Sequence, residues 1–237
     1  MDELLHYLQS DYYEEYKIEQ ILNNKIIITK NHIKNINCRM CISYSINIIS
    51  LFEKYGYIFT NDDYILLITK NGFMIQYITK NKQTNELCEI AVRQDADVFR
   101  YISNDKKTNK ICEIAVRQKT YIFEYIPKDK ITDKICEMAV KQMGCALISV
   151  PEDKKTDALC EIAVRQDGYI LKYVPEDKKT YEICKIAVQQ DGLALRYVPE
   201  DKKTDELCKM AVQQNNIALL SVPTKKLLFI KNETNNI

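Results

Sequence analysis

The sequence predicts an all-α fold, an αα-solenoid of about seven helix-turn-helix units of 24 residues each. The first observation is a fixed period without insertions, which three residue types mark independently. Threonine, cysteine and glutamine each recur every 24 residues, at Thr60, Thr84, Thr108, Thr132, Thr156, Thr180 and Thr204, at Cys88, Cys112, Cys136, Cys160, Cys184 and Cys208, and at Gln94, Gln118, Gln142, Gln166, Gln190 and Gln214. The second observation is that apolar residues within each unit follow helical spacing.

The first part of each unit is predicted to be a ten-residue α-helix. Thr204 suits an N-cap, and the carboxylates of Asp205 and Glu206 favour the first helical turn. The apolar residues that follow form one wide face, namely Leu207, Cys208, Met210, Ala211 and Val212. Gly or Asn closes the helix in five units, which predicts a left-handed C-cap at Gly72, Gly144, Gly168, Gly192 and Asn216.

The second part of each unit decides between two fold classes. In residues 193–198 the apolar positions are Ala194, Leu195, Tyr197 and Val198, with Arg196 between them. This spacing is helical, whereas a strand of an α/β horseshoe would alternate inside and outside. The residue before proline then ends the helix. We predict a short second helix and keep the α/β horseshoe as the alternative.

The chain is expected to have three parts. Residues 1–59 fit the 24-residue register poorly and are predicted to be an atypical N-terminal cap or decayed repeats, with a strand considered at residues 25–31. Residues 60–223 form the solenoid, and residues 224–237 form a C-terminal cap and polar tail. Terminal repeats of solenoids are commonly atypical because they seal the core.

Composition argues against several partners and compartments. The chain has 34 basic and 33 acidic residues, so its net charge of +1 creates no strong field for nucleic acid or a membrane. No apolar run approaches the roughly 18 to 20 residues that span a bilayer, and the N-terminus lacks a signal-peptide pattern. Nine cysteines in such a chain indicate reduced thiols, so we expect a protein that is not secreted.

The cysteines suggest metal or redox chemistry, but packing accounts for them better. Equivalent helices of neighbouring repeats lie about 8–10 Å apart, while a disulfide needs Cα atoms within about 7 Å. The repeated cysteines are therefore predicted to be buried and unbonded, among them Cys112, Cys136, Cys160 and Cys184. Cys38 and Cys41 form one CxxC pair without a second, so we expect neither a metal nor a cofactor.

Enzymatic function finds little support in the sequence. Both histidines lie outside the repeats, no Gly-rich phosphate loop is present, and paired carboxylates such as Glu176 and Asp177 are expected in solvated turns. The repeated glutamine is interpreted as a ladder of side-chain hydrogen bonds to turn backbones. The repeated tyrosines could stack on bases, but no basic stripe accompanies them, so we assign Tyr101, Tyr125, Tyr173 and Tyr197 to the core.

The stretch Glu161-Ile-Ala-Val-Arg-Gln-Asp-Gly-Tyr-Ile-Leu-Lys-Tyr-Val-Pro carries a family resemblance. It resembles a repeat family of unknown function, of the type "AVKQNG-AL-YV", that is abundant in giant DNA viruses of amoebae. Ala96 and Thr120 depart from that pattern where it has glycine. The resemblance implies a viral source, and with it the host cytoplasm, a virus factory or the virion; it supplies no activity and no catalytic residues.

The sequence thus leads to a non-enzymatic repeat scaffold that binds a protein partner through an extended surface. The second helices are expected to line that surface, since their outward positions vary between units while the core positions do not. The candidate partner-binding residues are Arg100, Tyr169, Lys172 and Arg196, a composition enriched in binding hot spots. A nucleic-acid-binding helical repeat protein is the alternative, and the oligomeric state stays open.

Overall fold

The structure, a computed structural model, describes residues 3–234, and within that span every regular element is helical. The all-α fold of repeated helix-turn-helix units is therefore confirmed, and the α/β horseshoe is wrong. The chain divides into two compact units, and the division falls between Lys130 and Ile131 in the sequence. Residues 235–237 of the predicted C-terminal segment lie outside the described part.

The first unit begins with five short helices. They are α1 (Glu3–Leu8), α2 (Glu15–Asn23), α3 (Lys30–Asn35), α4 (Cys38–Ser43) and α5 (Ile48–Lys54). The strand considered at residues 25–31 is absent: this stretch leads from a turn at Lys25, with φ of 59°, into α3. Tyr13 joins these short helices, since its hydroxyl donates to Leu8 O and accepts from Asn37 N at 2.9 Å.

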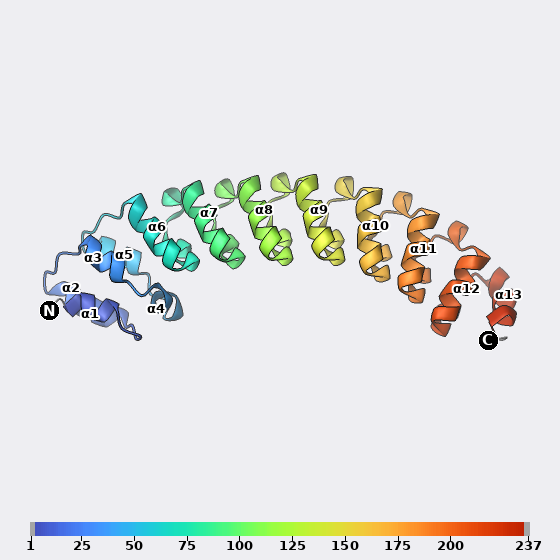
Figure 1. The fold of residues 1–237 in the computed structure, drawn as a ribbon, viewed down its shortest axis with the longest axis horizontal. Helices are drawn as coiled ribbons and strands as arrows, with labels where there is room; N and C mark the ends of the chain where they lie inside the picture. Colours follow the sequence, from blue (N-terminus) through green and yellow to red (C-terminus); the bar gives the residue numbers. More distant parts are fainter. Residues whose placement is uncertain (1–2, 235–237) are drawn as a thin grey trace. The chain divides into compact units, whose positions relative to one another are not determined.

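The repeats follow in both units, each as one α-helix and two 3₁₀ helices. In the first unit they are α6 (Asn61–Lys70), η1 (Gly72–Tyr77), η2 (Lys80–Lys82), α7 (Asn85–Gln94), η3 (Ala96–Tyr101), η4 (Asn104–Lys106), α8 (Asn109–Gln118), η5 (Thr120–Tyr125) and η6 (Lys128–Lys130). In the second they are α9 (Asp133–Gln142), η7 (Gly144–Ser149), η8 (Glu152–Lys154), α10 (Asp157–Gln166), η9 (Gly168–Tyr173), η10 (Glu176–Lys178), α11 (Tyr181–Gln190), η11 (Gly192–Tyr197), η12 (Glu200–Lys202), α12 (Asp205–Gln214), η13 (Asn216–Ser221) and the final α13 (Thr224–Thr234) (Figure 1).

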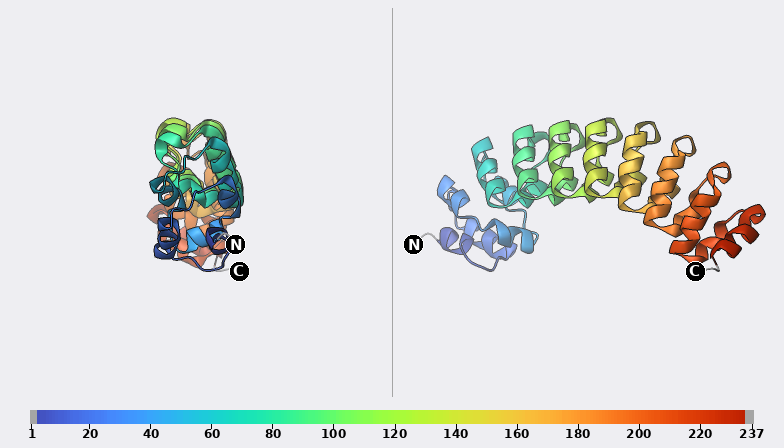
Figure 2. Two further views of the ribbon diagram at one scale, coloured as in Figure 1. Left: turned by 90° about the vertical axis from the view of Figure 1, so that its left-hand side faces the viewer. Right: turned by 45° about the vertical axis from the view of Figure 1, so that its right-hand side comes forward.

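Each repeat α-helix forms for the reasons that the sequence suggested. In α10 the Thr156 hydroxyl accepts a hydrogen bond from Leu159 N at 3.2 Å, and Asp157 lies in the first turn. The predicted apolar face is buried as Leu159, Cys160, Ala163 and Val164. Neighbouring α-helices pack side by side through these faces, α9 to α12 in the second unit and α6 to α8 in the first (Figure 2).

The second segment of each repeat is helical as predicted, but it is a six-residue 3₁₀ helix. In η9 the extended residue Asp167 precedes the helix, and its carboxylate accepts from Tyr169 N at 2.9 Å. At the other end Val174 returns to extended backbone, with φ of −76° and ψ of 131°, because it precedes Pro175. Caps at both ends confine this helix to six residues, and 3₁₀ helices occur only in short pieces.

The glycine at the start of this segment serves close packing. The predicted left-handed C-cap is wrong, because among the described glycines only Gly56 has a positive φ, of 85°. A Cβ on Gly168 would lie 2.3 Å from Ala187 O, in the next repeat. A Cβ on Gly192 would lie 2.6 Å from Ala211 O. Glycine is therefore present because the backbones of successive repeats approach each other there.

The repeated glutamine links successive repeats, which confirms the predicted ladder. Gln166 Nε2 donates to Val140 O at 2.9 Å and to Lys141 O at 3.2 Å, at the carboxyl end of the preceding α-helix. Its Oε1 accepts from Gly144 N at 2.7 Å. Gln118 makes the same three bonds in the first unit, to Val92 O, Arg93 O and Ala96 N. These side chains satisfy backbone groups that the helix ends leave open.

In four of the described repeats a lysine of the turn is buried, which the sequence did not predict. Lys155, Lys179 and Lys203 are 4–6% exposed, while the neighbouring Glu176 and Asp177 are exposed as expected. Lys155 Nζ donates to Glu152 Oε1 at 2.6 Å and to Tyr173 O of the next repeat at 3.0 Å. The methylene stem is buried while the ammonium closes the end of a 3₁₀ helix.

Candidate protein-interaction surface

The 3₁₀ helices of the second unit present one continuous outward surface. η9 contacts η7 and η11, and η11 contacts η13, so their outward side chains adjoin from repeat to repeat. We call this surface the 3₁₀ face; it consists of Cys145, Ile148, Ser149, Tyr169, Lys172, Tyr173, Leu193, Arg196, Tyr197, Ile217, Leu220 and Ser221. The residues between these outward positions belong to the core; for example, Ile170 and Leu171 of η9 are 2% and 0% exposed.

Aromatic rings and cations gather at the centre of the 3₁₀ face. The rings of Tyr169 and Tyr197 meet edge to face, with centroids 5.4 Å apart and planes at 89°. Lys172 Nζ lies 5.4 Å from the Tyr173 centroid and 5.8 Å from that of Tyr169. The Arg196 guanidinium lies 5.7 Å from the Tyr197 centroid. Such cation–π geometry orients exposed cations on an otherwise apolar surface.

Electrostatic interactions within this cluster favour the charged form of Lys172. The hydrogen bond with Tyr197, followed by the hydrogen bond with Lys172 and the charge of Lys172, lowers the pKa of Tyr169. The hydrogen bond with Tyr169 raises the pKa of Lys172 above its ordinary value. Within the described residues, no carboxylate forms an ion pair with Lys172 or Arg196. The cluster thus offers two uncompensated positive charges to a ligand.

The structure brings together three of the four predicted site residues. Tyr169, Lys172 and Arg196 belong to the cluster, and all three are exposed. Arg100 is exposed on η3 of the first unit, next to Tyr101, whose ring is 6.2 Å from that of Phe73. Arg100 therefore belongs to the first unit, whereas the other three candidates belong to the second.

The assignment of the repeated tyrosines to the core is wrong. Tyr101 and Tyr125 are 36% and 53% exposed, and Tyr173 and Tyr197 are half-buried on the 3₁₀ face. Tyrosine is amphipathic, so an apolar position in the helical pattern accommodates it at the edge of the core with its hydroxyl in water. The sequence contains one indication that this position is exposed, because two repeats have serine there in place of tyrosine. A core position would not tolerate that loss of volume.

Apolar side chains flank the cluster on both sides. Ile148 is 47% exposed on η7, and Ile217 and Leu220 are 59% and 88% exposed on η13. Exposed aliphatic groups of this size, adjacent to aromatic rings and cations, are typical of interaction surfaces.

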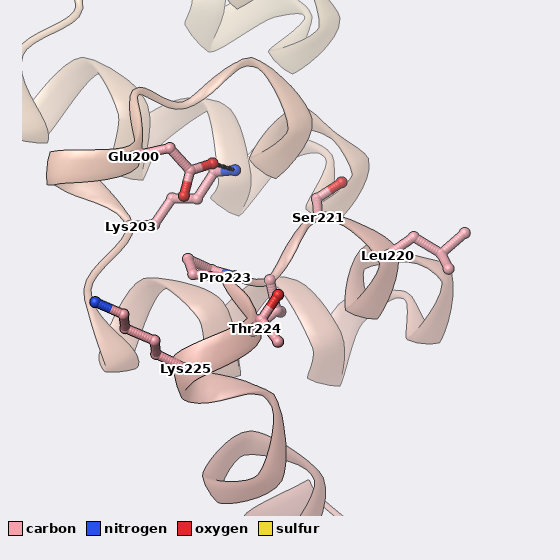
Figure 3. Close-up of a pocket in the computed structure, with 8 residues that line it drawn as sticks. Glu200, Lys203, Leu220, Ser221, Pro223, Thr224 and Lys225 are labelled. Atoms are coloured by element: carbon pink, nitrogen blue, oxygen red, sulfur yellow. Dashed lines mark hydrogen bonds and ion pairs between the residues drawn. The ribbon is translucent and has the colours of Figure 1, made fainter.

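A pocket of about 570 Å³ lies beyond the cluster, between η13 and the start of α13. It is lined by Glu200, Lys203, Leu220, Ser221, Val222, Pro223, Thr224 and Lys225, and Figure 3 shows these side chains with Lys203 bonded to Glu200. Ser221 stands where the two preceding repeats have Tyr173 and Tyr197. The pocket is therefore open at the position where those repeats carry a ring.

Burial holds the thiols of the CxxC pair and of the repeats in their protonated form. Burial raises the pKa of Cys38 to about 11, and it also raises that of Cys41. The repeated cysteines are buried and unbonded, which confirms that prediction, and burial raises the pKa of Cys160 to about 11. His32 Nδ1 accepts from Thr29 N at 2.9 Å as part of a helix cap. The described residues contain no group of three or more His, Cys, Asp and Glu suited to a metal ion.

Among the helices of the described residues, none has the length and apolar character needed to cross a membrane.

Comparison with known proteins gives one family match. Residues 180–228 match the family model described as "Domain of unknown function (DUF4116)", a span that includes α11, α12 and the first turns of α13. No curated protein and no solved structure matches the chain. The C-terminal repeats are thus similar to a domain of unknown function, and that similarity carries no activity with it.

Proposed function

We propose that the chain is a non-enzymatic repeat scaffold that binds a protein partner through the 3₁₀ face of its second unit. The observation that supports it is the cluster of Tyr169, Lys172, Arg196 and Tyr197, which are exposed or half-buried and whose cations lack carboxylate partners. Tyrosine and arginine dominate binding hot spots because they combine large contact area with directional polar groups.

The chemistry of this face supports binding more than catalysis. Its twelve residues include neither a carboxylate nor an imidazole, the groups that most often transfer protons in enzymes. The repeated thiols are buried and protonated, so they are poor nucleophiles.

A nucleic-acid partner is the second candidate, since tyrosine rings beside cations also bind single strands. Two features favour a protein. Tyr169 and Tyr197 pack edge to face against each other, which covers surface that a base would need. The exposed Ile148 and Leu220 add apolar area where a sugar-phosphate backbone would require charge.

A viral origin in amoebae and a location in the host cytoplasm, a virus factory or the virion belong to the same proposal. Eight buried, unbonded thiols fit a reducing compartment. A composition rich in Ile, Asn, Lys and Tyr fits an A+T-rich genome.

Affinity capture with matched variants tests the proposed function. The test variant carries Tyr169→Ala, Lys172→Ala and Arg196→Ala. The control carries Tyr181→Ala, Lys141→Ala and Arg165→Ala, the same residue types on the α-helices of the same unit. We expect the test variant to keep its thermal stability within about 1–2 kcal/mol, as surface changes do, and to lose the partner at least tenfold.

Two outcomes would overturn the proposal. One is equal recovery of the partner by the wild type, the test variant and the control, since the 3₁₀ face would then not be the site. The other is recovery that disappears with nuclease treatment, which would show that nucleic acid holds the complex together.

A further inference from the structure

We infer that the 3₁₀ face binds an acidic segment of its partner in polyproline II conformation, with two carboxylates three residues apart and a large apolar or aromatic side chain three residues beyond. This inference rests on the proposed function and specifies the chemistry of the ligand. Three features of the second unit carry it: the charge of the face, the spacing of its cations and the pocket at its end.

The charge of the face selects an acidic ligand. Lys172 and Arg196 are its two ionised side chains at neutral pH, and within the described residues neither pairs with a carboxylate. The acids nearest in sequence, Glu176 and Glu200, are paired with Lys179 and Lys203. Asp167 and Asp191, on the other side, accept from the backbone of η9 and η11. A ligand carboxylate would therefore meet attraction from both cations without repulsion from the face itself.

The spacing of the cations selects the ligand's backbone conformation. Lys172 and Arg196 occupy equivalent positions 24 residues apart, so they are separated by one repeat. Packed helices lie about 8–10 Å apart. A polyproline II helix advances about 9.3 Å in three residues and returns every third side chain to the same side. A β-strand would present alternate residues, about 6.6 Å apart, which matches the spacing less well.

Aromatic residues on the face support the same conformation. Polyproline II segments dock into grooves lined by aromatic rings, because their backbone is preformed and loses little entropy on binding. Tyr169, Tyr173 and Tyr197 provide such rings between the two cations, with their positions fixed by contacts of 5.4–6.3 Å between centroids.

The pocket marks the third site, one repeat beyond Arg196. Leu220 corresponds to Arg196 by position and lines the pocket together with Ser221, which replaces a tyrosine. Two lysines line the pocket: the ammonium of Lys203 is bonded to Glu200 at 2.6 Å, and Lys225 leaves one cation there. A ligand ring or large aliphatic group can enter this volume beside Leu220 and Pro223 (Figure 3).

Fluorescence anisotropy with synthetic peptides tests the inference on the full chain. The probe is a twelve-residue proline-rich peptide with glutamate at its fourth and seventh positions and phenylalanine at its tenth. A second peptide has the reverse order, since the face does not set the direction of the ligand chain. Matched peptides replace both glutamates by glutamine, or phenylalanine by glycine.

The expected result is that one of the two orders binds at least fivefold tighter than its glutamine counterpart, and that this preference shrinks as salt is added. The preference should vanish in the Lys172→Gln, Arg196→Gln variant and persist in Lys141→Gln, Arg165→Gln. The two variants lose the same residue types and the same charge, but the latter residues lie on α-helices and are already paired with Glu137 and Glu161. Reversal to Lys172→Glu, Arg196→Glu should favour a peptide with lysines in place of glutamates.

The inference is overturned if both glutamate peptides bind no better than their glutamine forms, or if both neutralised variants lose the preference equally. The proposed function has its own readout. Suppose that the alanine variant of Tyr169, Lys172 and Arg196 loses a protein partner, while the wild type shows no preference for acidic peptides. The 3₁₀ face would then remain the proposed binding surface, and only the acidic polyproline II ligand would be rejected. An unchanged affinity for the glycine peptide would reject the role of the pocket.

Discussion

At the scale of single residues, the repeat is governed by contacts between backbones of adjacent repeats. Gly168 has ordinary negative φ, yet a side chain there would meet Ala187 O. Ala96 and Thr120 occupy the same position in the first unit and carry a Cβ. Two repeats of the first unit therefore accommodate a Cβ at this position.

The substitution Gly168→Ala tests this packing. A Cβ placed 2.3 Å from a carbonyl oxygen forces the two repeats apart, so we expect a loss of about 1–3 kcal/mol in the free energy of unfolding, as for overpacked cores. The control is Ala96→Gly, which removes a tolerated Cβ and should cost about 1 kcal/mol or less through chain entropy. Urea denaturation followed by circular dichroism measures both; equal stability of Gly168→Ala and wild type would contradict the close approach.

Thiol reactivity offers a second test at this scale. Of the nine cysteines, Cys145 is exposed and the other eight are buried. A thiol reagent at neutral pH should label Cys145 quickly and the others only at the rate of local or global opening. Mass spectrometry counts the labels. Rapid labelling of several repeated cysteines, or a mass that indicates disulfides among them, would contradict their buried position.

The same thiols predict a fall in stability in alkaline solution. Burial raises the pKa of Cys136, Cys160 and Cys184 to about 11 from an ordinary value of 9.0. Between these values the thiols ionise in the unfolded chain but stay protonated in the folded one. The free energy of unfolding should therefore be unaffected below about pH 9 and decrease as pH rises towards 11.

Denaturation measured at several pH values checks this effect. A Cys160→Ala, Cys184→Ala variant should show a smaller decrease, since it has two fewer thiols to ionise. An identical decrease in wild type and variant would place its cause elsewhere, for example in the tyrosines.

At the scale of elements, the glutamine ladder connects neighbouring repeats. Gln166 bridges two carbonyls at the end of α9 and the first amide of η7. The exposed Gln213 on α12 differs from it, since no such bridge involves its side chain.

Replacement of Gln166 by Ala should cost about 1–3 kcal/mol, because partly buried backbone groups lose their partners. Gln213→Ala should change stability by no more than about 0.5 kcal/mol. Thermal denaturation of the two variants checks the difference. Equal melting temperatures would show that water replaces the glutamine without loss.

The elements were predictable where periodicity determines them and less so where side chains are amphipathic. The spacing of Leu159, Cys160, Ala163 and Val164 specified the α-helix, because an i, i+4 pattern of buried residues fits no strand. The 3₁₀ character of η9 was not predictable, since six residues between two caps give α and 3₁₀ helices the same apolar pattern. Tyr173 was misplaced, and the burial of Lys179 was not predicted, because each side chain combines a buried body with a polar tip.

At the scale of the whole molecule, the repeats separate two tasks. Positions that recur, such as the threonine caps, the cysteines and the glutamines, build the stack. Positions on the outward side of the 3₁₀ helices vary, and in the second unit they place two cations, three tyrosine rings and flanking aliphatic groups on one surface. Three of the predicted site residues could be found from this variation; the pocket could not, because its opening depends on how α13 follows η13.

The central claim is that the 3₁₀ face of the second unit is the binding surface. Hydrogen–deuterium exchange of the full chain, alone and with its captured partner, tests it most directly. We predict slower exchange on binding in η9 and η11, with smaller effects in η7 and η13 and little change in α9 to α12. Protection confined to the α-helices of the second unit, or to the first unit, would contradict the account.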